Sequence, residues 1–122
     1  KNLRLYLKDL RSWQKAMKSE EFGISEKALK SICDLFSKYP DVEKAAIIGS
    51  RAKGNYQKGS DIDIVIWAPK LDFSKYLRLV AELEDLEIPY KIDLLKYELI
   101  SNDTLKEHIK RVGKEIYNKK GL

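Results

Sequence analysis

The sequence predicts an α/β fold in which helices flank one β-sheet. Hydrophobic patterns support this prediction, because segments with helical spacing alternate along the chain with short apolar segments typical of strands. The length supports a single unit, since 122 residues suffice for one domain with a hydrophobic core and are too few for two. The sequence contains no internal repeat, low-complexity tract or interdomain linker. We therefore expect one sheet and one core.

Large apolar residues near the N-terminus recur at helical spacing, which predicts a first amphipathic helix over residues 3–18. They are Leu3, Leu7, Leu10, Trp13 and Met17. A break at residues 20–23 follows, so we expect residues 1–24 to form an N-terminal helical extension and residues 25–122 to form the main domain. The role of the extension stays open between packing on the core, docking a partner and belonging to residues added to the natural chain.

A second helix is predicted from Ser25 onward, where Glu26 supplies a negative charge that favours a helix start. Pro40 should end it, because proline lacks the backbone N–H and clashes with the preceding turn. Cys33 is the single cysteine, so it cannot form an intramolecular disulfide, and we expect it to be a small core residue. One cysteine and one histidine also argue against a zinc site.

Three segments have the composition of strands. Residues 42–48 are short, apolar and rich in β-branched side chains, with turn residues on both sides. Residues 62–67 alternate and then become continuously apolar, and residues 88–95 supply the third expected strand.

Two more helices are expected in the second half of the chain. One covers residues 73–86, where apolar residues again follow helical spacing. The other covers residues 100–117, with Ser101 or Asn102 as its N-cap. Its apolar stripe consists of Leu105, Ile109, Val112 and Ile116.

The net charge is +5, from 24 basic and 19 acidic residues, which favours an anionic ligand such as a nucleotide, nucleic acid or an acidic protein surface. Much of this charge lies in residues 106–120, where basic and acidic residues mix as on a solvated helix. No apolar run is long enough for a membrane span, and residues 1–18 lack the apolar segment of a signal peptide. We therefore expect a cytoplasmic protein that binds no membrane.

Two aspartates in the second expected strand need an explanation. Successive side chains of a strand point to opposite faces, so Asp61 and Asp63 share one face while Ile62 and Ile64 take the other. At a separation of about 5 Å and an effective dielectric constant of about 20, the two charges would repel by about 3 kcal/mol. A fold that keeps both must solvate them, protonate one or bind a cation between them.

A third carboxylate comes from Asp93 in the third expected strand. Tyr90, Ile92 and Leu94 share the core face of that strand, so Asp93 points to the other face. If the second and third strands adjoin, Asp93 reaches the site of the other two aspartates. Carboxylates without nearby His or Cys suit Mg²⁺ or Mn²⁺ rather than zinc.

The segment between the first two strands has residues that can bind phosphate. Gly49 lets the backbone approach a ligand, and Ser50 lies where a strand turns into an expected helix, so its hydroxyl and nearby amides can bind phosphate oxygens. Four candidates follow: Arg51, Lys53 and Lys58 as positive charges, and Ser60 as a cap or phosphate ligand. The segment matches neither GxxxxGK[ST] nor GxGxxG, so it lacks the residues of a Walker loop or a dinucleotide fold.

Gly49-Ser50, the next ten residues and Asp61-Ile62-Asp63 resemble the GS-x10-DxD signature of minimal nucleotidyltransferases in the DNA polymerase β-like superfamily. The likeness includes the GSRAKG loop and the YKIDLL strand with Asp93, and it covers roughly residues 25–117. Within the superfamily the chain resembles the MntA-type antitoxins, which are usually encoded beside a small helical partner, a HEPN toxin of HepT type or a substrate-binding protein. The resemblance implies a mixed β-sheet of three or more strands flanked by helices.

The resemblance also implies a reaction in which AMP passes from ATP to a tyrosine hydroxyl of the partner toxin, which is thereby inactivated, and pyrophosphate departs. It assigns Asp61 and Asp63 to Mg²⁺, and Asp93 to a second Mg²⁺ ion or to the proton of the acceptor hydroxyl. It assigns ATP binding to Gly49, Ser50, Arg51, Lys53 and Ser60.

Other functions stay open. A nucleotidyltransferase acting on a small molecule, such as an aminoglycoside, or on RNA would use the same residues, as would a non-catalytic antitoxin that keeps the site for nucleotide binding or stability. Larger relatives hold the acceptor with an additional domain, for which this chain has little room, so a protein partner is favoured. Polymerisation on a long nucleic acid is least expected, because the basic residues are scattered. A DxD pair alone can also be outward charge on an edge strand.

Overall fold

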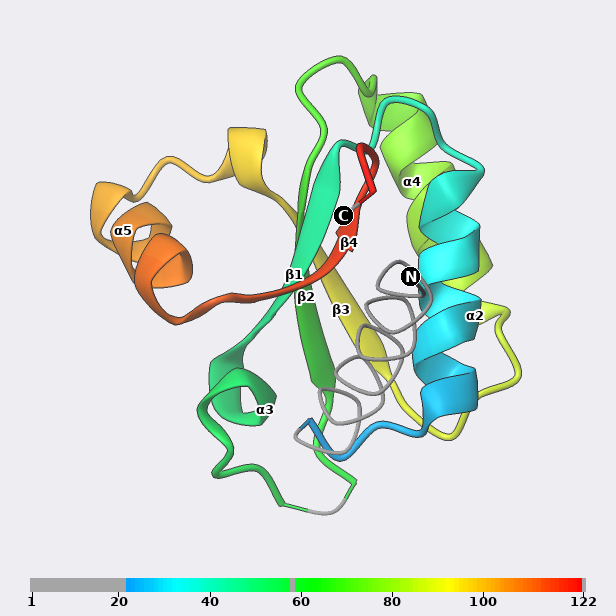
Figure 1. Cartoon of the computed structure of the whole chain (residues 1–122). Helices are drawn as coiled ribbons and strands as arrows, with labels where there is room; N and C mark the ends of the chain where they lie inside the picture. The colour runs from blue at the N-terminus through cyan, green and yellow to red at the C-terminus, as the bar shows by residue number, and fades with distance from the viewer. Residues whose placement is uncertain (1–21, 58, 122) are drawn as a thin grey trace, which may run out of the picture.

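The computed structural model of the chain describes residues 22–57 and 59–121. In these ranges one four-stranded sheet lies between two layers of helices (Figure 1). The strands are β1 (Lys44–Ile48), β2 (Ile62–Trp67), β3 (Ile92–Lys96) and β4 (Lys114–Asn118), and they lie side by side in the order β3-β2-β1-β4. Strand β1 is antiparallel to β2 and β4, whereas β2 and β3 are parallel, so the predicted mixed sheet is confirmed.

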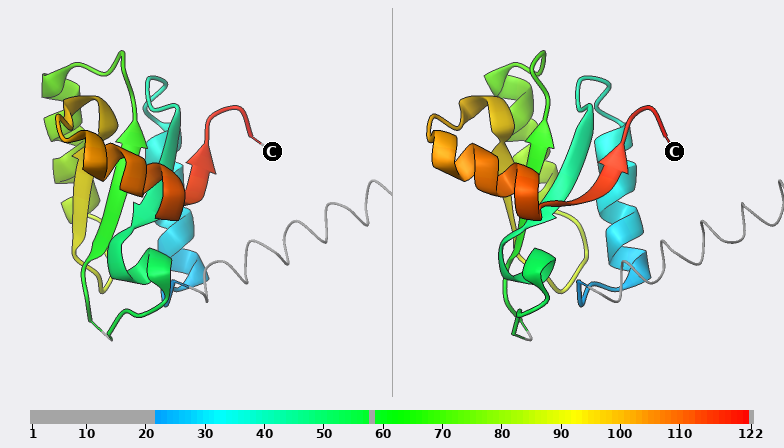
Figure 2. Two further views of the ribbon diagram at one scale, coloured as in Figure 1. Left: turned by 90° about the vertical axis from the view of Figure 1, so that its left-hand side faces the viewer. Right: turned by 60° about the vertical axis from the view of Figure 1, so that its left-hand side comes forward.

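The helices divide between the two faces of the sheet. They are α2 (Glu26–Ser37), α3 (Gly49–Lys53), α4 (Phe73–Glu84), the short 3₁₀ helix η1 (Tyr97–Leu99) and α5 (Asp103–Val112). Helices α2 and α4 cover one face, and α3 and α5 lie on the other, as the turned views in Figure 2 also show. None of the helices among the described residues combines the length and apolar character that crossing a bilayer requires.

The three longer helices start with side-chain caps. The side chains of Ser25, Asp72 and Asn102 accept hydrogen bonds from backbone N–H groups three residues ahead, at 3.1, 2.8 and 3.1 Å. Each bond satisfies one of the N–H groups that a helix start leaves without a partner. The expectation that Ser101 or Asn102 caps the last helix is thus confirmed for Asn102.

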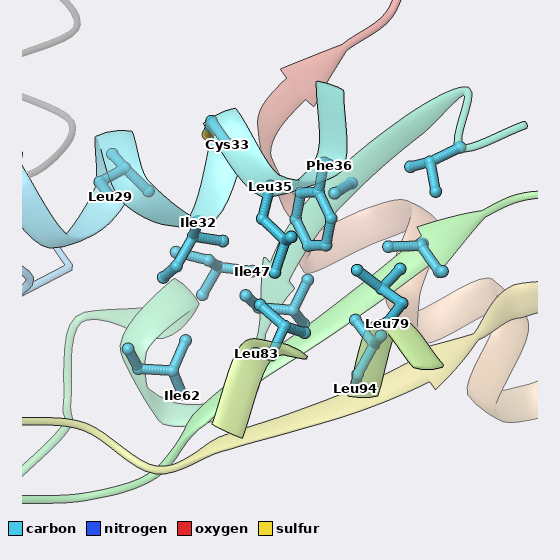
Figure 3. Close-up of a cluster of buried hydrophobic side chains, with 14 of the residues drawn as sticks. Leu29, Ile32, Cys33, Leu35, Phe36, Ile47, Ile62, Leu79, Leu83 and Leu94 are labelled. Atoms are coloured by element: carbon cyan, nitrogen blue, oxygen red, sulfur yellow. The ribbon is translucent and has the colours of Figure 1, made fainter. Parts of the chain in front are cut away.

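The main hydrophobic core lies between the sheet and helices α2 and α4 (Figure 3). Ile62, Ile64 and Ile66 of β2 all point to this face and are completely buried. Ile32 and Phe36 of α2 meet them from the helix layer, also with no exposed surface. Burying a side chain of this size stabilises the fold by about 1.5–3 kcal/mol. The predicted alternation of β2 is therefore confirmed, with its isoleucines on the core face.

The opposite face of the sheet is covered less completely. A small apolar cluster joins β1, β2 and α5 and consists of Ala46, Ile48, Val65 and Ile109. Beside it, Trp67 stacks on Tyr97 with ring centroids 5.1 Å apart and an interplanar angle of 24°. In β2, Asp63 precedes Val65 on this same face, so its carboxylate projects next to α3 rather than into the main core.

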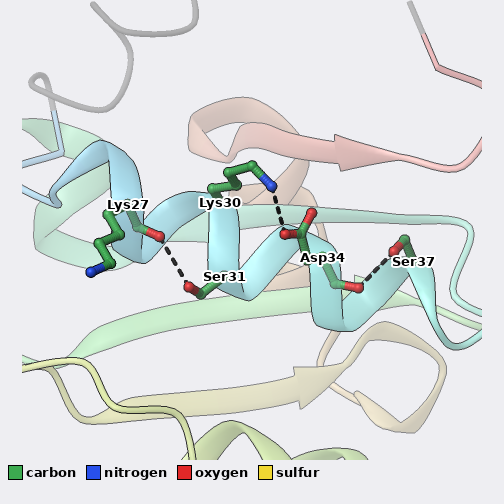
Figure 4. Close-up of polar contacts among 5 residues, drawn as sticks. All are labelled: Lys27, Lys30, Ser31, Asp34 and Ser37. Carbon is green, nitrogen blue, oxygen red and sulfur yellow. Dashed lines mark hydrogen bonds and ion pairs between the residues drawn. The ribbon is translucent and has the colours of Figure 1, made fainter.

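The exposed surface of α2 carries local polar contacts within the helix (Figure 4). Lys30 and Asp34 form an ion pair at 2.8 Å, one helical turn apart. The hydroxyls of Ser31 and Ser37 donate to backbone carbonyls of the same helix, at 3.1 and 2.6 Å. Solvated i, i+4 pairs of this kind contribute little to stability.

The predicted helix over residues 100–117 is wrong in its second half. Helix α5 ends at Val112, and Lys114–Asn118 forms β4 against β1, with Ala45 opposite Tyr117. Gly113 marks the break, because its extended backbone (φ −62°, ψ 141°) leaves the helix after its N–H donates to the carbonyl of Ile109 at 2.8 Å. As a strand, this segment hydrogen-bonds to the edge of β1, whose own backbone groups would otherwise lack these partners, and this outweighs the helical spacing of Ile116.

Other boundaries differ less from the predictions. The third strand begins at Ile92 instead of residue 88. Cys33 is buried, as expected, and its Sγ donates to the carbonyl of Ile116 at 3.3 Å. The predicted helix over residues 3–18 lies outside the described residues. Phe22 and Ile24, assigned to the N-terminal extension, are buried in the main core.

Candidate active site

Strand pairing brings the carboxylates together. Asp63 of β2 and Asp93 of β3 are opposite each other in a parallel pair, so their side chains project from the same face of the sheet. Asp61 directly precedes β2 and is exposed beside them. The expectation that the second and third strands adjoin, with Asp93 turned away from the core, is confirmed.

Asp63 has an unusual environment for a carboxyl group. Burial raises its pKa above the ordinary value, and the negative charges of Asp93 and Asp61 raise it further. Both effects disfavour the ionised form, so the site stores an electrostatic cost that a bound cation would remove. Asp61 and Asp93 are exposed, which leaves their oxygens accessible to an ion or a ligand.

Gly49 connects the phosphate-binding candidates to the carboxylates. Its φ is +76°, a left-handed conformation that glycine adopts without steric cost. A Cβ atom added here would lie 2.6 Å from Oδ2 of Asp63, so a larger residue would displace the carboxylate. Gly49 begins α3 and Ser50 follows in its first turn, whose N–H groups lack helical partners. The two halves of the predicted site are therefore adjacent in space.

Arg51, predicted to contact phosphate, has backbone carbonyls as its partners in the structure. Its side chain is only 2% exposed, and its guanidinium donates to the carbonyls of Phe22, Gly23 and Ser60. Two tyrosine rings lie close to the same group, Tyr56 at 5.0 Å and Tyr90 at 5.3 Å from the guanidinium carbon. Sequence spacing carries no signal for this arrangement, because the carbonyls and rings come from separate segments.

The remaining candidates have different surroundings. Lys53 is exposed at the end of α3, where a positive charge can reach a bound anion. The hydroxyl of Ser60 is buried and has no hydrogen-bond partner within the described ranges, so its bonding capacity is available. Lys58 lies outside the described residues.

The comparison with known families gives a match over most of the chain. The family described as "Polymerase beta, Nucleotidyltransferase" matches residues 30–121, which run from within α2 to the end of β4 and include all the carboxylates above. The chain belongs to the polymerase β-like nucleotidyltransferase family. Its Gly49-Ser50 and Asp61-Ile62-Asp63 motifs therefore lie inside the matched domain.

A relative that is similar in sequence shows which type of nucleotidyltransferase the chain resembles. The "Probable protein adenylyltransferase MntA" of Haemophilus influenzae is 34% identical over 97 residues, which cover 79% of this chain and 78% of that protein. The resemblance to MntA-type proteins inferred from the sequence is confirmed by this relative.

Solved structures show the same nucleotidyltransferase fold. A toxin-antitoxin crystal structure with AMP-PNP gives a TM-score of 0.62 at 23% identity, covering 74% of this chain and 73% of that chain. The toxin-antitoxin MntA-HepT gives a TM-score of 0.59 at 19% identity, covering 79% and 74%. At these identities the similarity establishes the fold.

The donor set of this nucleotidyltransferase fits a magnesium ion that is shared with its substrate. Among the described residues, no three His, Cys, Asp or Glu side chains are grouped so that they could hold a metal ion alone. Mg²⁺ commonly binds one or two carboxylates and completes its coordination with water and substrate phosphates. Asp63 and its neighbours supply such oxygens beside the Gly49-Ser50 turn.

Proposed function

We propose that this protein is the antitoxin of a toxin-antitoxin pair and transfers AMP from ATP to a tyrosine hydroxyl of its partner. The observation that carries the proposal is the contact between Gly49 and Asp63, with Asp93 beside them. The turn that we propose to bind phosphate thus lies close to paired carboxylates, and this closeness supports phosphoryl chemistry. The 34% identity to a probable protein adenylyltransferase supports a protein acceptor.

Each proposed residue has a distinct task. Asp61 and Asp63 hold Mg²⁺ on the triphosphate, while the Ser50 hydroxyl and the first N–H groups of α3 bind its phosphate oxygens. Asp93 binds a second Mg²⁺ ion or accepts the proton of the acceptor hydroxyl. The ions supply positive charge that stabilises the oxygens of the reacting phosphate.

The reaction is a substitution at the α-phosphorus of ATP. The acceptor oxygen forms a bond to this phosphorus while the bond to the bridging oxygen of the β-phosphate breaks. The hydroxyl proton passes to Asp93 or to water, and pyrophosphate leaves. In this proposal Lys53, exposed at the end of α3, attracts the departing negative charge.

The proposed partner is a small helical protein of HEPN type, encoded nearby, that carries the acceptor tyrosine. The described part of the chain consists of the nucleotidyltransferase core and has no further domain to enclose an acceptor. The solved toxin-antitoxin structures of similar fold, one of them named MntA-HepT, support a toxin as partner.

Mass spectrometry tests this function directly. The purified protein, ATP, Mg²⁺ and the product of the neighbouring gene are incubated, and the partner is expected to gain the mass of one or more AMP units on a tyrosine. Replacing that tyrosine with phenylalanine should abolish the gain. Intact ATP binding without any mass change on the partner would favour a nucleotide-binding antitoxin that does not catalyse transfer.

A further inference from the structure

Arg51 connects the two main parts of the proposed site. It directly follows Ser50 in α3, and its side chain is almost completely buried. Its Nε and Nη2 donate to the carbonyl of Ser60 at 3.2 and 2.7 Å. Because Ser60 directly precedes Asp61, one side chain ties the phosphate-binding turn to the start of the carboxylate strand.

The same guanidinium also lies close to the segment just before the strand that carries the third carboxylate. The ring of Tyr90, just before β3, lies 5.3 Å from the guanidinium carbon. The ring of Tyr56, in the connection from α3 to β2, lies 5.0 Å from it. Aromatic faces attract a cation, so these rings hold the group in place while Tyr90 leads into the strand of Asp93.

A third set of contacts reaches the segment before α2. Nη1 donates to the carbonyls of Phe22 and Gly23, at 2.8 and 3.2 Å. Gly23 has a φ of +67°, and a Cβ atom there would lie 2.4 Å from the ring of Tyr56. This segment therefore closes tightly over the guanidinium and separates it from solvent.

Within residues 22–57 and 59–121, no carboxylate forms an ion pair with Arg51. The ion pair found in the described parts of the chain joins Lys30 and Asp34 and does not involve Arg51. A buried cation without a counter-ion is costly, and carbonyl dipoles and aromatic faces offset part of that cost here. The planar fork of arginine can donate to three carbonyls at once, whereas lysine provides a single point charge.

We propose that Arg51 is a positioning residue, whose guanidinium holds the Gly49-Ser50 turn, Asp61-Asp63 and Asp93 at the separation that nucleotidyl transfer requires. This inference rests on the proposed function. It differs from a phosphate contact, because the fork points to backbone carbonyls and is closed off from solvent.

The first test compares Arg51→Lys with Arg78→Lys. Arg78 is an exposed arginine on α4, across the sheet from the site, and Arg78→Lys should leave transfer unchanged. In folded Arg51→Lys, kcat should fall about 100-fold, because a displacement of about 1 Å at a reacting centre slows a reaction by about this factor. The KM for ATP at saturating Mg²⁺ should change much less. An unchanged kcat overturns the proposal, and so does a large rise in KM at unchanged kcat, which would indicate a direct phosphate contact.

A second pair of variants covers the case in which Arg51→Lys does not fold. Tyr90→Phe keeps the ring beside the guanidinium but loses the hydrogen bonds that the hydroxyl makes with the carbonyl of Gly23 and the N–H of Ser25. Tyr90→Leu loses the ring as well, so its kcat should be about tenfold or more below that of Tyr90→Phe. Equal kcat values in the two folded Tyr90 variants contradict the proposal.

A binding measurement separates this proposal from the proposed function. Without any partner, Mn²⁺ should increase the affinity of the wild type for ATP, since the turn and the carboxylates share the ion. This increase should shrink in Arg51→Lys and Tyr90→Leu and persist in Arg78→Lys. If Mn²⁺ increases the ATP affinity of the wild type but no AMP is transferred, the proposed function is wrong. The comparison of the variants in this binding measurement still tests whether Arg51 positions the site. The same increase in all variants overturns the positioning role.

Discussion

Asp63 on β2 and Asp93 on β3 are register partners across the parallel strands, and Gly49 approaches the Asp63 carboxylate so closely that no side chain fits between them. Burial and charge raise the pKa of Asp63, so this relationship costs stability when nothing is bound. Residues retained at such a cost are typical of functional sites.

Replacing both aspartates of the DxD motif should separate activity from stability. In Asp61→Asn combined with Asp63→Asn, we expect transfer to fall at least about 1,000-fold, since charge stabilisation by bound metal is worth several kcal/mol. The fold should be as stable as the wild type or more so, because carboxylate repulsion is removed. Activity assays and thermal melts check both points, with the exposed Asp85→Asn as control. Mg²⁺-dependent transfer by the double variant would disprove the metal-site assignment.

The stability of the protein should depend on the ionisation of Asp63. Its folded pKa lies above the ordinary value of 3.8, so the folded state holds this proton more tightly than the unfolded state. The stabilisation that comes from the protonated Asp63 carboxyl is complete below pH 3.8, and it is lost as pH rises through the raised pKa of the folded state. Asp63→Asn should therefore gain stability relative to wild type as pH rises through this window, and then keep a constant advantage. Urea unfolding of both proteins across pH measures the difference, and a constant difference at all pH values would contradict it.

Gly49→Ala should lower stability and activity more than Gly54→Ala, a substitution with similar backbone strain. Gly54 has a similar φ, +81°, but a Cβ atom there meets nothing within 4 Å, so Gly54→Ala reports strain alone, about 1 kcal/mol or more. Gly49→Ala adds the 2.6 Å approach to Asp63 and should lose more stability and most of its activity. Denaturant unfolding and transfer assays compare the two variants. If they are equal in stability and activity, the contact with Asp63 has no consequence.

Ionisation of Tyr39 should lower the stability of the fold at alkaline pH, because its side chain links the end of α2 to α4. Its hydroxyl donates to Glu82, and burial together with this bond raises the pKa of Tyr39 from 10.0 to about 12. The proton is held more tightly in the folded state, so stability falls as pH rises from 10.0 towards about 12.

Tyr39→Phe tests this prediction. The substitution should lower the free energy of unfolding by about 1 kcal/mol at neutral pH, because the hydrogen bond is lost. The loss of stability above pH 10 that comes from ionisation of Tyr39 should be absent from this variant. Unfolding curves at rising pH, with ultraviolet titration of the tyrosines, provide the measurement. An alkaline decline identical to that of the wild type would show that Tyr39 is not responsible.

The predicted fold and much of the predicted site follow from local patterns. Alternation in β2 was sufficient to put Ile62 in the core and Asp63 on the other face, because strand geometry fixes where successive side chains point. The C-terminal segment was predicted wrongly because Ile116 continues a helical spacing, whereas pairing with the open edge of β1 decides its state. For Arg51 the sequence shows a positive charge, which suggests a phosphate contact, but it does not show that the side chain is buried.

The sequence by itself determined the α/β class, the core faces of the strands, and the motifs that mark a nucleotidyltransferase. These features depend on residues a few positions apart, where periodicity and turn chemistry act directly. Only the tertiary structure decided that Asp93 lies beside Asp63, that Gly49 touches the same carboxylate, and that Arg51 ties these segments together. Such relationships depend on strand order and on backbone carbonyls from distant segments, which no local spacing specifies.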